Sequence, residues 1–291
     1  MKRLFIITLA LCGLTIFGTS CKEKRLKDFQ QTEDGLYYKF IAQDTAARSA
    51  NDGDYLFMTL SYRTDNDSIV FNEQEVVEIM RERQYPGDLS DAFRMMHEGD
   101  EAVFAFKADS FMLKSGMPEL PPFIKDTTML YFTVRMNKIR SMAEIDSEKT
   151  EEIKSYMASH NLTAEPTESG LYFIETQPGK GKELTAGDSV SIRYTFRTIN
   201  DSIFDSSEKE GGQPLYCIVG QMFSGLNEGL GKMKRGGKAT LIMPYKIAFG
   251  DRFNPYVPVP AFSTIVADIE VLPNIVRPQP APAPAPAPVI E

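Results

Sequence analysis

An internal repeat constrains the fold of this chain more than any other feature of its sequence. The segment YRTDNDSIVFN at 62–72 recurs 134 positions later as FRTINDSIFDS at 196–206. Two Gly-Leu-Tyr triplets, at 35–37 and 170–172, lie at nearly the same offset. The chain has 291 residues, which is enough for two domains of ordinary size. A repeat of this period therefore predicts two copies of one domain.

Each copy has the pattern of an antiparallel sheet with little helix. The strand near residue 190 alternates between an apolar and a polar face, and its apolar residues are Val190, Ile192, Tyr194 and Phe196. Asn-Asp-Ser at 66–68 and 200–202 has the composition of a turn between strands. One short helix is expected in each copy, over 89–98 and 224–233. This arrangement predicts the α+β fold class.

The residues between the copies predict a connecting helix. Ser141 and Glu144 have the spacing of a capping box, and an apolar face continues from there to about His160. The sequence therefore divides into a signal peptide over 1–20, a tether over 21–34, a first domain over 35–140, a connecting helix and linker over 141–165, a second domain over 166–274 and a Pro/Ala-rich tail over 275–291. We expect the tail to be disordered and extended, because proline lacks the backbone donor that helices and sheets need.

The N-terminal residues predict export and lipid attachment. Lys2 and Arg3 precede an apolar run at 4–17, which is too short for a comfortable membrane span, and small residues then lead to Cys21. This order resembles a bacterial lipoprotein signal, although Gly18 stands where leucine is usual. We expect a lipid anchor on Cys21 and a place in the cell envelope, on the periplasm-facing outer membrane. An ordinary secretory signal with an incidental cysteine is the alternative.

Composition and charge argue against several function classes. A net charge of −8 argues against a nucleic-acid partner, because phosphate recognition needs a basic surface. The sequence contains no metal-ligand constellation, phosphate loop or nucleophile elbow. Its two histidines, His97 and His160, fall in expected helices and are interpreted as solvated. Cys217 lies in an apolar strand and is interpreted as a small buried residue rather than a nucleophile.

The second copy carries a series of short motifs in a fixed order. They are Tyr194 in the first long strand, Phe-Asp-Ser-Ser at 204–207, Phe-Ser-Gly-Leu-Asn-Glu-Gly-Leu at 223–230, Met-Lys-Arg-Gly-Gly-Lys-Ala at 233–239, Ile-Ala-Phe-Gly at 247–250 and Val-Pro-Ala at 259–261. In order and spacing, these motifs resemble those of the FKBP-type peptidyl-prolyl cis-trans isomerases. The resemblance implies two FKBP-like domains, each a curved antiparallel sheet around a short helix, in the layout of a two-domain lipoprotein.

The resemblance also implies an activity. Members of this family rotate the X–Pro peptide bond, whose barrier of about 18–20 kcal/mol makes rotation slow enough to limit folding. No bond to carbon is made or broken, so neither a metal nor a cofactor is implied. We expect an isomerase that acts on proline-containing unfolded or exported proteins. A non-catalytic chaperone or scaffold for unfolded envelope proteins is the alternative.

The resemblance assigns site residues one by one. Tyr194, Phe204 and Asp205 match the family's catalytic positions. The backbone N–H of Phe223 is implied to receive the substrate carbonyl. The substrate-binding lining is implied to comprise Leu215, Met222, Phe223, Leu226, Phe249, Val259 and Ala267.

Three of these residues depart from the family's pattern. Leu226 replaces a tryptophan, Phe249 a tyrosine and Ala267 a phenylalanine, which predicts a wider and less polar pocket. Phe253 and Tyr256, in the loop before Val259, are candidates to fill the gap.

The first copy departs from the pattern further. Phe71-Asn72 stands in place of Phe-Asp, and Ser-Gly-Met-Pro at 115–118 replaces Ala-Phe-Gly. Its three nearby prolines are interpreted as loop stiffeners, namely Pro118, Pro121 and Pro122. We therefore expect the first copy to lack an active pocket.

Overall fold

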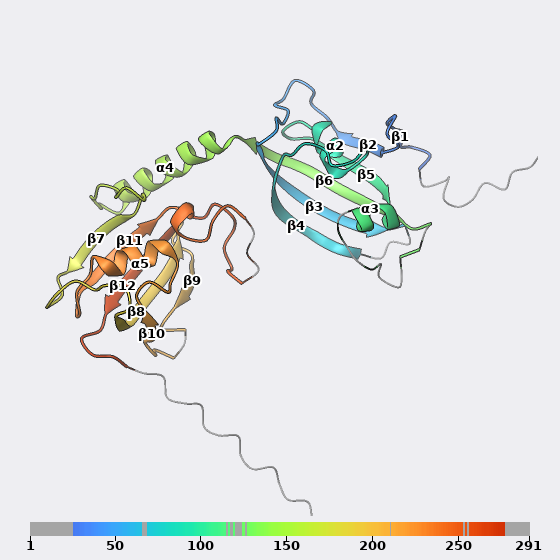
Figure 1. Ribbon diagram of the computed structural model, residues 1–291. Coiled ribbons are helices and arrows are strands. Elements are labelled where there is room, and N and C mark those ends of the chain that lie inside the picture. Colours follow the sequence, from blue (N-terminus) through green and yellow to red (C-terminus); the bar gives the residue numbers. More distant parts are fainter. Residues whose placement is uncertain are drawn as a thin grey trace, which may run out of the picture. The chain divides into compact units, whose positions relative to one another are not determined.

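The computed structural model describes residues 26–276, apart from 66–68, 115, 117–118, 120–123, 126, 210, 253 and 255 (Figure 1). The expected signal peptide, Cys21, the start of the tether, the tail from residue 277, the three prolines of the first copy and Phe253 lie outside the described residues. The chain forms two compact units. Among the described residues, the second comprises 51–58, 75–80 and those from 138 to 276, and the first comprises the remainder.

The first six-stranded sheet has the order β1-β2-β5-β6-β3-β4. Its strands are β1 (Gln30–Gln31), β2 (Tyr37–Ala42), β3 (Tyr55–Thr64), β4 (Ile69–Ile79), β5 (Glu101–Lys107) and β6 (Met129–Arg140). Two helices accompany this sheet, α2 (Leu89–Arg94) and α3 (Ala108–Lys114). The expectation of a single helix over 89–98 was therefore wrong. Residue 97 lies beyond α2, where the His97 imidazole contacts the buried Asp100 carboxylate at 3.2 Å.

The second six-stranded sheet has the order β10-β8-β12-β11-β7, and β9 pairs with β8. Its strands are β7 (Tyr172–Gln177), β8 (Ser189–Thr198), β9 (Ile203–Ser206), β10 (Leu215–Ile218), β11 (Lys238–Met243) and β12 (Ile265–Val271). The helix α5 (Ser224–Gly231) and the 3₁₀ turn η1 (Tyr245–Ile247) complete this part of the second unit.

The two sheets repeat one topology. The order β2-β5-β6-β3-β4 in the first sheet corresponds to β7-β11-β12-β8-β9 in the second. The predicted α+β class and its duplicated domain are therefore confirmed. The alternation in β8 is confirmed as well, because Val190, Ile192, Tyr194 and Phe196 are all at least nine-tenths buried.

The core of the second unit lies between its sheet and α5. Leu226 and Leu230 of α5 are fully buried against residues of β8, β11 and β12. Gly229 permits this close approach, since a Cβ there would lie 2.3 Å from Cδ1 of Leu241. The packing fixes the start of α5, where Phe223 is the N-cap residue. Cys217 is buried in the same core, as expected.

The connecting helix α4 (Met142–Ser159) begins at the predicted capping box. Ser141 Oγ accepts the Glu144 N–H, and the Glu144 carboxylate accepts the Ser141 N–H. The helix buries Ile153, Tyr156 and Met157 against Ile242 and Val266 of the second sheet.

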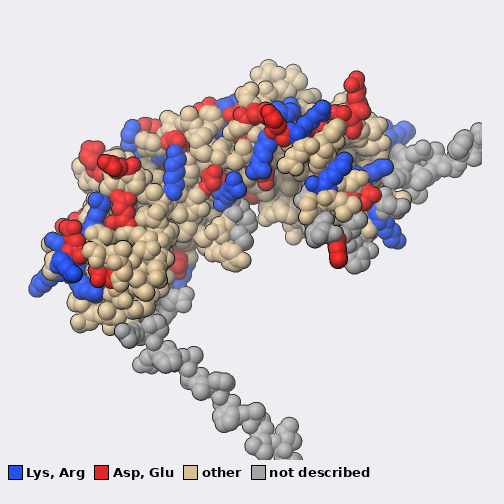
Figure 2. Space-filling model, viewed as in Figure 1, with Lys and Arg blue, Asp and Glu red and all other residues tan. Residues whose placement is uncertain are grey.

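The described surface carries charges of both signs. On the face shown in Figure 2, lysine and arginine are interspersed with aspartate and glutamate. Among the described helices, none is both long and apolar enough to cross a bilayer.

Candidate active site

A β-bulge in β9 places two consecutive side chains on one face of the sheet. Phe196 pairs with Asp205, but Arg197 pairs with Ile203, so Phe204 is the extra residue. In a regular strand, neighbouring side chains point to opposite faces. The bulge removes this alternation, and both Phe204 and Asp205 contact rings on the buried face of β8.

Asp205 is held by a tyrosine of the neighbouring strand. The Tyr194 hydroxyl donates to Oδ2 of Asp205 at 3.1 Å. Tyr194 is only 9% exposed, so its ring has little freedom to move away. The carboxylate therefore has a defined position at the edge of the apolar core, and Asp205 itself is partly exposed.

Four phenylalanine rings form a cluster beside this carboxylate. Phe196 contacts Phe204 at 6.2 Å and Phe223 at 6.0 Å between ring centroids. Phe249 closes the group, at 6.1 Å from Phe204 and 5.1 Å from Phe223. Phe204, Phe223 and Phe249 are only partly buried, so the cluster keeps an accessible apolar surface. We call Phe196, Phe204, Phe223 and Phe249 the aromatic cluster.

The other predicted lining residues lie in the core that supports the cluster. Leu226, Val259 and Ala267 are buried there, with exposed fractions of 0%, 7% and 0%. Leu215 and Met222 are partly buried and pack against the same core. All the predicted lining residues of the second copy thus belong to one contiguous apolar cluster, and Asp205 lies at its edge through its bond to Tyr194.

Asn227 fixes the loop that leads into α5. Its Oδ1 accepts the backbone N–H groups of Gly220 at 2.8 Å and Met222 at 3.1 Å, and its Nδ2 donates to the Met222 carbonyl. These bonds orient the segment that carries Phe223. No role for Asn227 was expected from the sequence, although an asparagine one turn into a helix can bond the preceding backbone.

Two further residues differ from expectation. Phe196 was not assigned to the site, yet its ring joins Phe204 to Phe223. Phe196 follows Tyr194 by two positions in the same strand, so the alternation of side chains already predicted that both lie on one face. Tyr256 was a candidate to fill the gap left by smaller side chains, but it is 92% exposed and does not fill it. Its neighbour Val257, not Tyr256, packs against the core.

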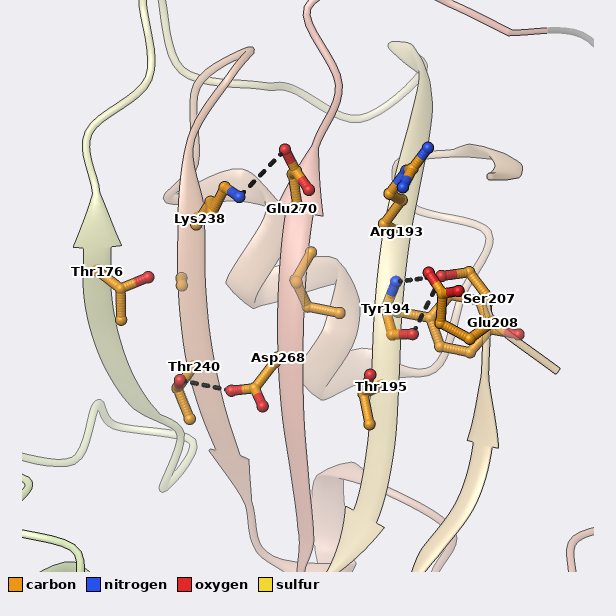
Figure 3. Close-up of a pocket in the computed structure, with 12 residues that line it drawn as sticks. Thr176, Arg193, Tyr194, Thr195, Ser207, Glu208, Lys238, Thr240, Asp268 and Glu270 are labelled. Carbon is orange, nitrogen blue, oxygen red and sulfur yellow. Dashed lines mark hydrogen bonds and ion pairs between the residues drawn. The ribbon is translucent and has the colours of Figure 1, made fainter. Parts of the chain in front are cut away.

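A separate hollow of about 360 Å³ lies on the polar face of the second sheet (Figure 3). Lys238 and Glu270 form an ion pair across it at 3.3 Å, and the Thr240 hydroxyl donates to Asp268 at 2.7 Å. A proline ring gains little from polar groups that already satisfy one another. The aromatic cluster is therefore the better candidate for a proline-binding surface.

The first unit has an aromatic ring where the second has the carboxylate. Tyr62, the repeat equivalent of Phe196, stacks on Phe71 with centroids 5.2 Å apart and planes at 3°. Phe196 is paired with Asp205, and the offset of 134 relates Asp205 to Phe71. Phe71, not Asn72, is thus the equivalent of Asp205. The expected match of Phe71-Asn72 to Phe204-Asp205 is therefore one residue out of register with the repeat offset of 134.

The first unit also carries a large residue where the second has alanine. Phe104 pairs with Phe132 in the first sheet, as Leu241 pairs with Ala267 in the second. Phe132 contacts Tyr62 at 4.7 Å between centroids. It also contacts Phe111 of α3 at 5.0 Å. These rings pack on one another in the place where the second unit exposes its cluster.

Comparison with known proteins gives one matching family model and a set of similar proteins. The family model described as FKBP-type peptidyl-prolyl cis-trans isomerase matches residues 180–272. A probable FKBP-type peptidyl-prolyl cis-trans isomerase of Haemophilus influenzae is 31% identical over 46% of this chain and 55% of its own length. An FK506-binding protein of Neisseria meningitidis serogroup B is 36% identical over 35% of this chain and 94% of its own length.

A solved structure, FkpA from Escherichia coli, is similar at 28% identity with a TM-score of 0.38. The match covers 45% of this chain and 62% of that one. The chain spans about half the length of the first curated relatives it matches.

Proposed function

The chain belongs to the family of FKBP-type peptidyl-prolyl cis-trans isomerases, and we propose that its second unit rotates X–Pro bonds in exported proteins. The observation that carries this proposal is the bulge that sets Phe204 and Asp205 side by side, with Asp205 bound to Tyr194. A proline ring needs an apolar surface, and the rotating bond needs a polar group at its edge. The second unit combines both.

The chemistry follows from the electronic structure of the imide. Planarity depends on a charge-separated resonance form that water stabilises through hydrogen bonds. Binding against phenylalanine rings removes that water and so lowers the cost of twisting. Asp205 acts at the rim of this surface, either on the twisted carbonyl or by orienting Tyr194. In this proposal the N–H of Phe223, the N-cap residue of α5, receives the substrate carbonyl.

The test is a refolding reaction limited by one prolyl bond, catalysed by the full chain. Asp205→Asn keeps an oxygen that accepts from Tyr194 but loses the charge, whereas Asp205→Ala loses both. A hydrogen bond to a charged group contributes about 1.5–3 kcal/mol, or about 10–100-fold in rate. We expect kcat/KM to fall by that range in Asp205→Ala.

Glu208→Ala is the matched control, because it removes a carboxylate from the polar hollow in Figure 3. We expect its kinetics to equal those of the wild type. The proposal fails if stoichiometric wild-type protein leaves the refolding rate unchanged, or if Asp205→Ala is as active as Glu208→Ala. A smaller loss in Asp205→Asn than in Asp205→Ala assigns the orienting role to the carboxylate.

The N-terminal sequence supports a lipid anchor in the cell envelope as part of this proposal. The basic start, the apolar run at 4–17 and the small residues before Cys21 have the order of a lipoprotein signal. Cys21→Ser is expected to move the protein from the membrane fraction to the soluble fraction without altering its isomerase activity. Equal membrane association of the two proteins contradicts the anchor.

A further inference from the structure

The turn that precedes Phe249 is bound to the connecting helix through the Asp146 carboxylate, beside a contact of 3.1 Å between the Tyr245 hydroxyl and Sδ of Met142 and apolar packing on Ile145. The Tyr245 hydroxyl donates to Oδ1 of Asp146 at 2.8 Å. The Lys246 ammonium contacts Oδ2 at 2.7 Å. Burial raises the pKa of Asp146, but the bonds to Lys246 and Tyr245 outweigh it, and the net pKa is lowered. The carboxylate is therefore charged and uses both oxygens to hold two consecutive residues of η1.

Tyr245 in turn holds the residues on either side of Phe249. The Tyr245 carbonyl accepts the N–H of Ala248 at 3.1 Å and the N–H of Gly250 at 2.9 Å. Its ring is 3% exposed and lies edge-on to Phe262, with centroids 4.9 Å apart. A shift of Tyr245 therefore moves the backbone around Phe249.

Phe249 closes the aromatic cluster, so its position decides the shape of the candidate proline surface. It contacts Phe204 and Phe223 but is itself only partly buried. Packing alone leaves such a ring freedom to move. The contacts of η1 with α4 further restrain the backbone beside Phe249. Helix α4 precedes residues 180–272, which the family model matches.

We propose that Asp146 is a positioning residue for the isomerase site, which sets the Phe249 wall by holding Tyr245 and Lys246. This inference rests on the proposed function for its kinetic consequence. It assigns part of the substrate affinity to α4, an element outside the family-matched segment. Loss of the carboxylate removes two polar restraints on η1, so the proline surface is less firmly preformed and binds substrate more weakly.

Glu148 provides a matched control on the same helix. Its carboxylate bonds Lys138 at 2.6 Å and Arg140 at 3.0 Å, so like Asp146 it has two side-chain donors, although both are cations whereas Asp146 has one ammonium and one hydroxyl. Both partners precede α4, and neither belongs to η1. Any general loss of α4 stability therefore appears in Glu148→Ala as well as in Asp146→Ala.

The experiment measures kcat and KM of the full chain on a short prolyl peptide, well below the unfolding midpoints of all variants. We expect Asp146→Ala to raise KM about tenfold, with a smaller effect on kcat. Tyr245→Phe, which removes only the hydroxyl, is expected to give part of this increase, and Glu148→Ala none. Equal KM values for Asp146→Ala and Glu148→Ala overturn the inference.

A second readout does not depend on activity. NMR of the Phe249 ring and the Gly250 amide is expected to change in Asp146→Ala but not in Glu148→Ala. If the wild type proves inactive, the proposed function fails, while these spectra still decide the positioning role. Unchanged Phe249 and Gly250 signals in Asp146→Ala overturn it.

Discussion

At the scale of single residues, the Tyr194 hydroxyl determines where the Asp205 carboxylate lies. Tyr194 and Asp205 are bound across neighbouring strands, and the Tyr194 ring is buried while the carboxylate is partly exposed. The Tyr194 hydroxyl thus restrains the orientation of the Asp205 carboxylate, which the packing of Asp205 does not hold in place. We expect Tyr194 to act by orienting Asp205. Comparing kcat/KM with the free energy of unfolding separates this effect from a loss of stability.

Tyr194→Phe is expected to lower kcat/KM of prolyl isomerisation by about tenfold and the free energy of unfolding by about 1 kcal/mol. Tyr216→Phe is the control. The Tyr216 hydroxyl donates a hydrogen bond of 3.0 Å to Ser189 Oγ, and neither residue belongs to the aromatic cluster. Its loss is expected to affect stability similarly and kinetics not at all. Equal kcat/KM for the two variants contradicts the assignment. Urea titrations and the refolding assay supply the two measurements.

Tyr245 predicts how stability depends on alkaline pH. Burial, the hydrogen bond to Asp146 and the charge of that carboxylate raise the pKa of Tyr245. Above about pH 10 the unfolded chain releases this proton while the folded chain retains it, so the free energy of unfolding falls as pH rises. We expect this fall to be less steep in Tyr245→Phe, measured by urea unfolding between pH 8 and about pH 11. Identical slopes contradict the prediction.

At the scale of elements, α5 lies close to its sheet because two of its three glycines face atoms that a side chain would overlap. A Cβ at Gly225 would lie 2.9 Å from the Ile247 carbonyl oxygen, and one at Gly229 would overlap the fully buried Leu241 side chain. The N-terminus of the helix, and with it Phe223, is therefore held at a fixed distance from the sheet.

Gly229→Ala is expected to destabilise the protein by about 1–3 kcal/mol, because Leu241 must move within a packed core. Gly231→Ala on the same helix is the control, since the nearest atom to its added Cβ is 4.0 Å away. There we expect no loss and a gain of up to about 1 kcal/mol from reduced backbone freedom. The free energies come from urea unfolding. A loss at Gly231 equal to that at Gly229 contradicts this account.

At the scale of the whole molecule, one duplicated topology carries two different interiors. The two sheets share their strand order, yet Phe71 and Phe132 of the first unit correspond to Asp205 and Ala267 of the second. Rings stack on one another in the first unit, which leaves no equivalent of the carboxylate. We therefore expect only the second unit to contribute catalysis.

The full chain with Asp205→Ala tests this division of roles. It is expected to lose the isomerase activity that Asp205 supports, with no compensation from the first unit. Adding Phe71→Asp to that variant is expected to restore nothing, because Phe132 and Phe111 still occupy the interior. Recovery of kcat/KM in the double variant contradicts the account. Thermal unfolding of both variants confirms that the comparison is made on folded protein.

The sequence predicted the parts of this protein that depend on local pattern. Alternating apolar residues identified β8, and the Ser141–Glu144 spacing identified the start of α4. The same reasoning overextended α2 and omitted α3. Short helices have few turns over which a period of 3.6 residues can show, so their limits depend on what they pack against.

The sequence by itself therefore determined the repeat, the α+β class, the family and the identities of most residues in the candidate site. Only the tertiary structure decided that Phe204 and Asp205 share a face, that Phe71 stacks on Tyr62, and that Asp146 holds a turn 99 residues away. The physical reason is the sequence separation over which each interaction acts. Periodicity and capping are relations between residues a few positions apart, whereas a bulge depends on the register of a partner strand and a carboxylate's partner on the packing of the whole unit.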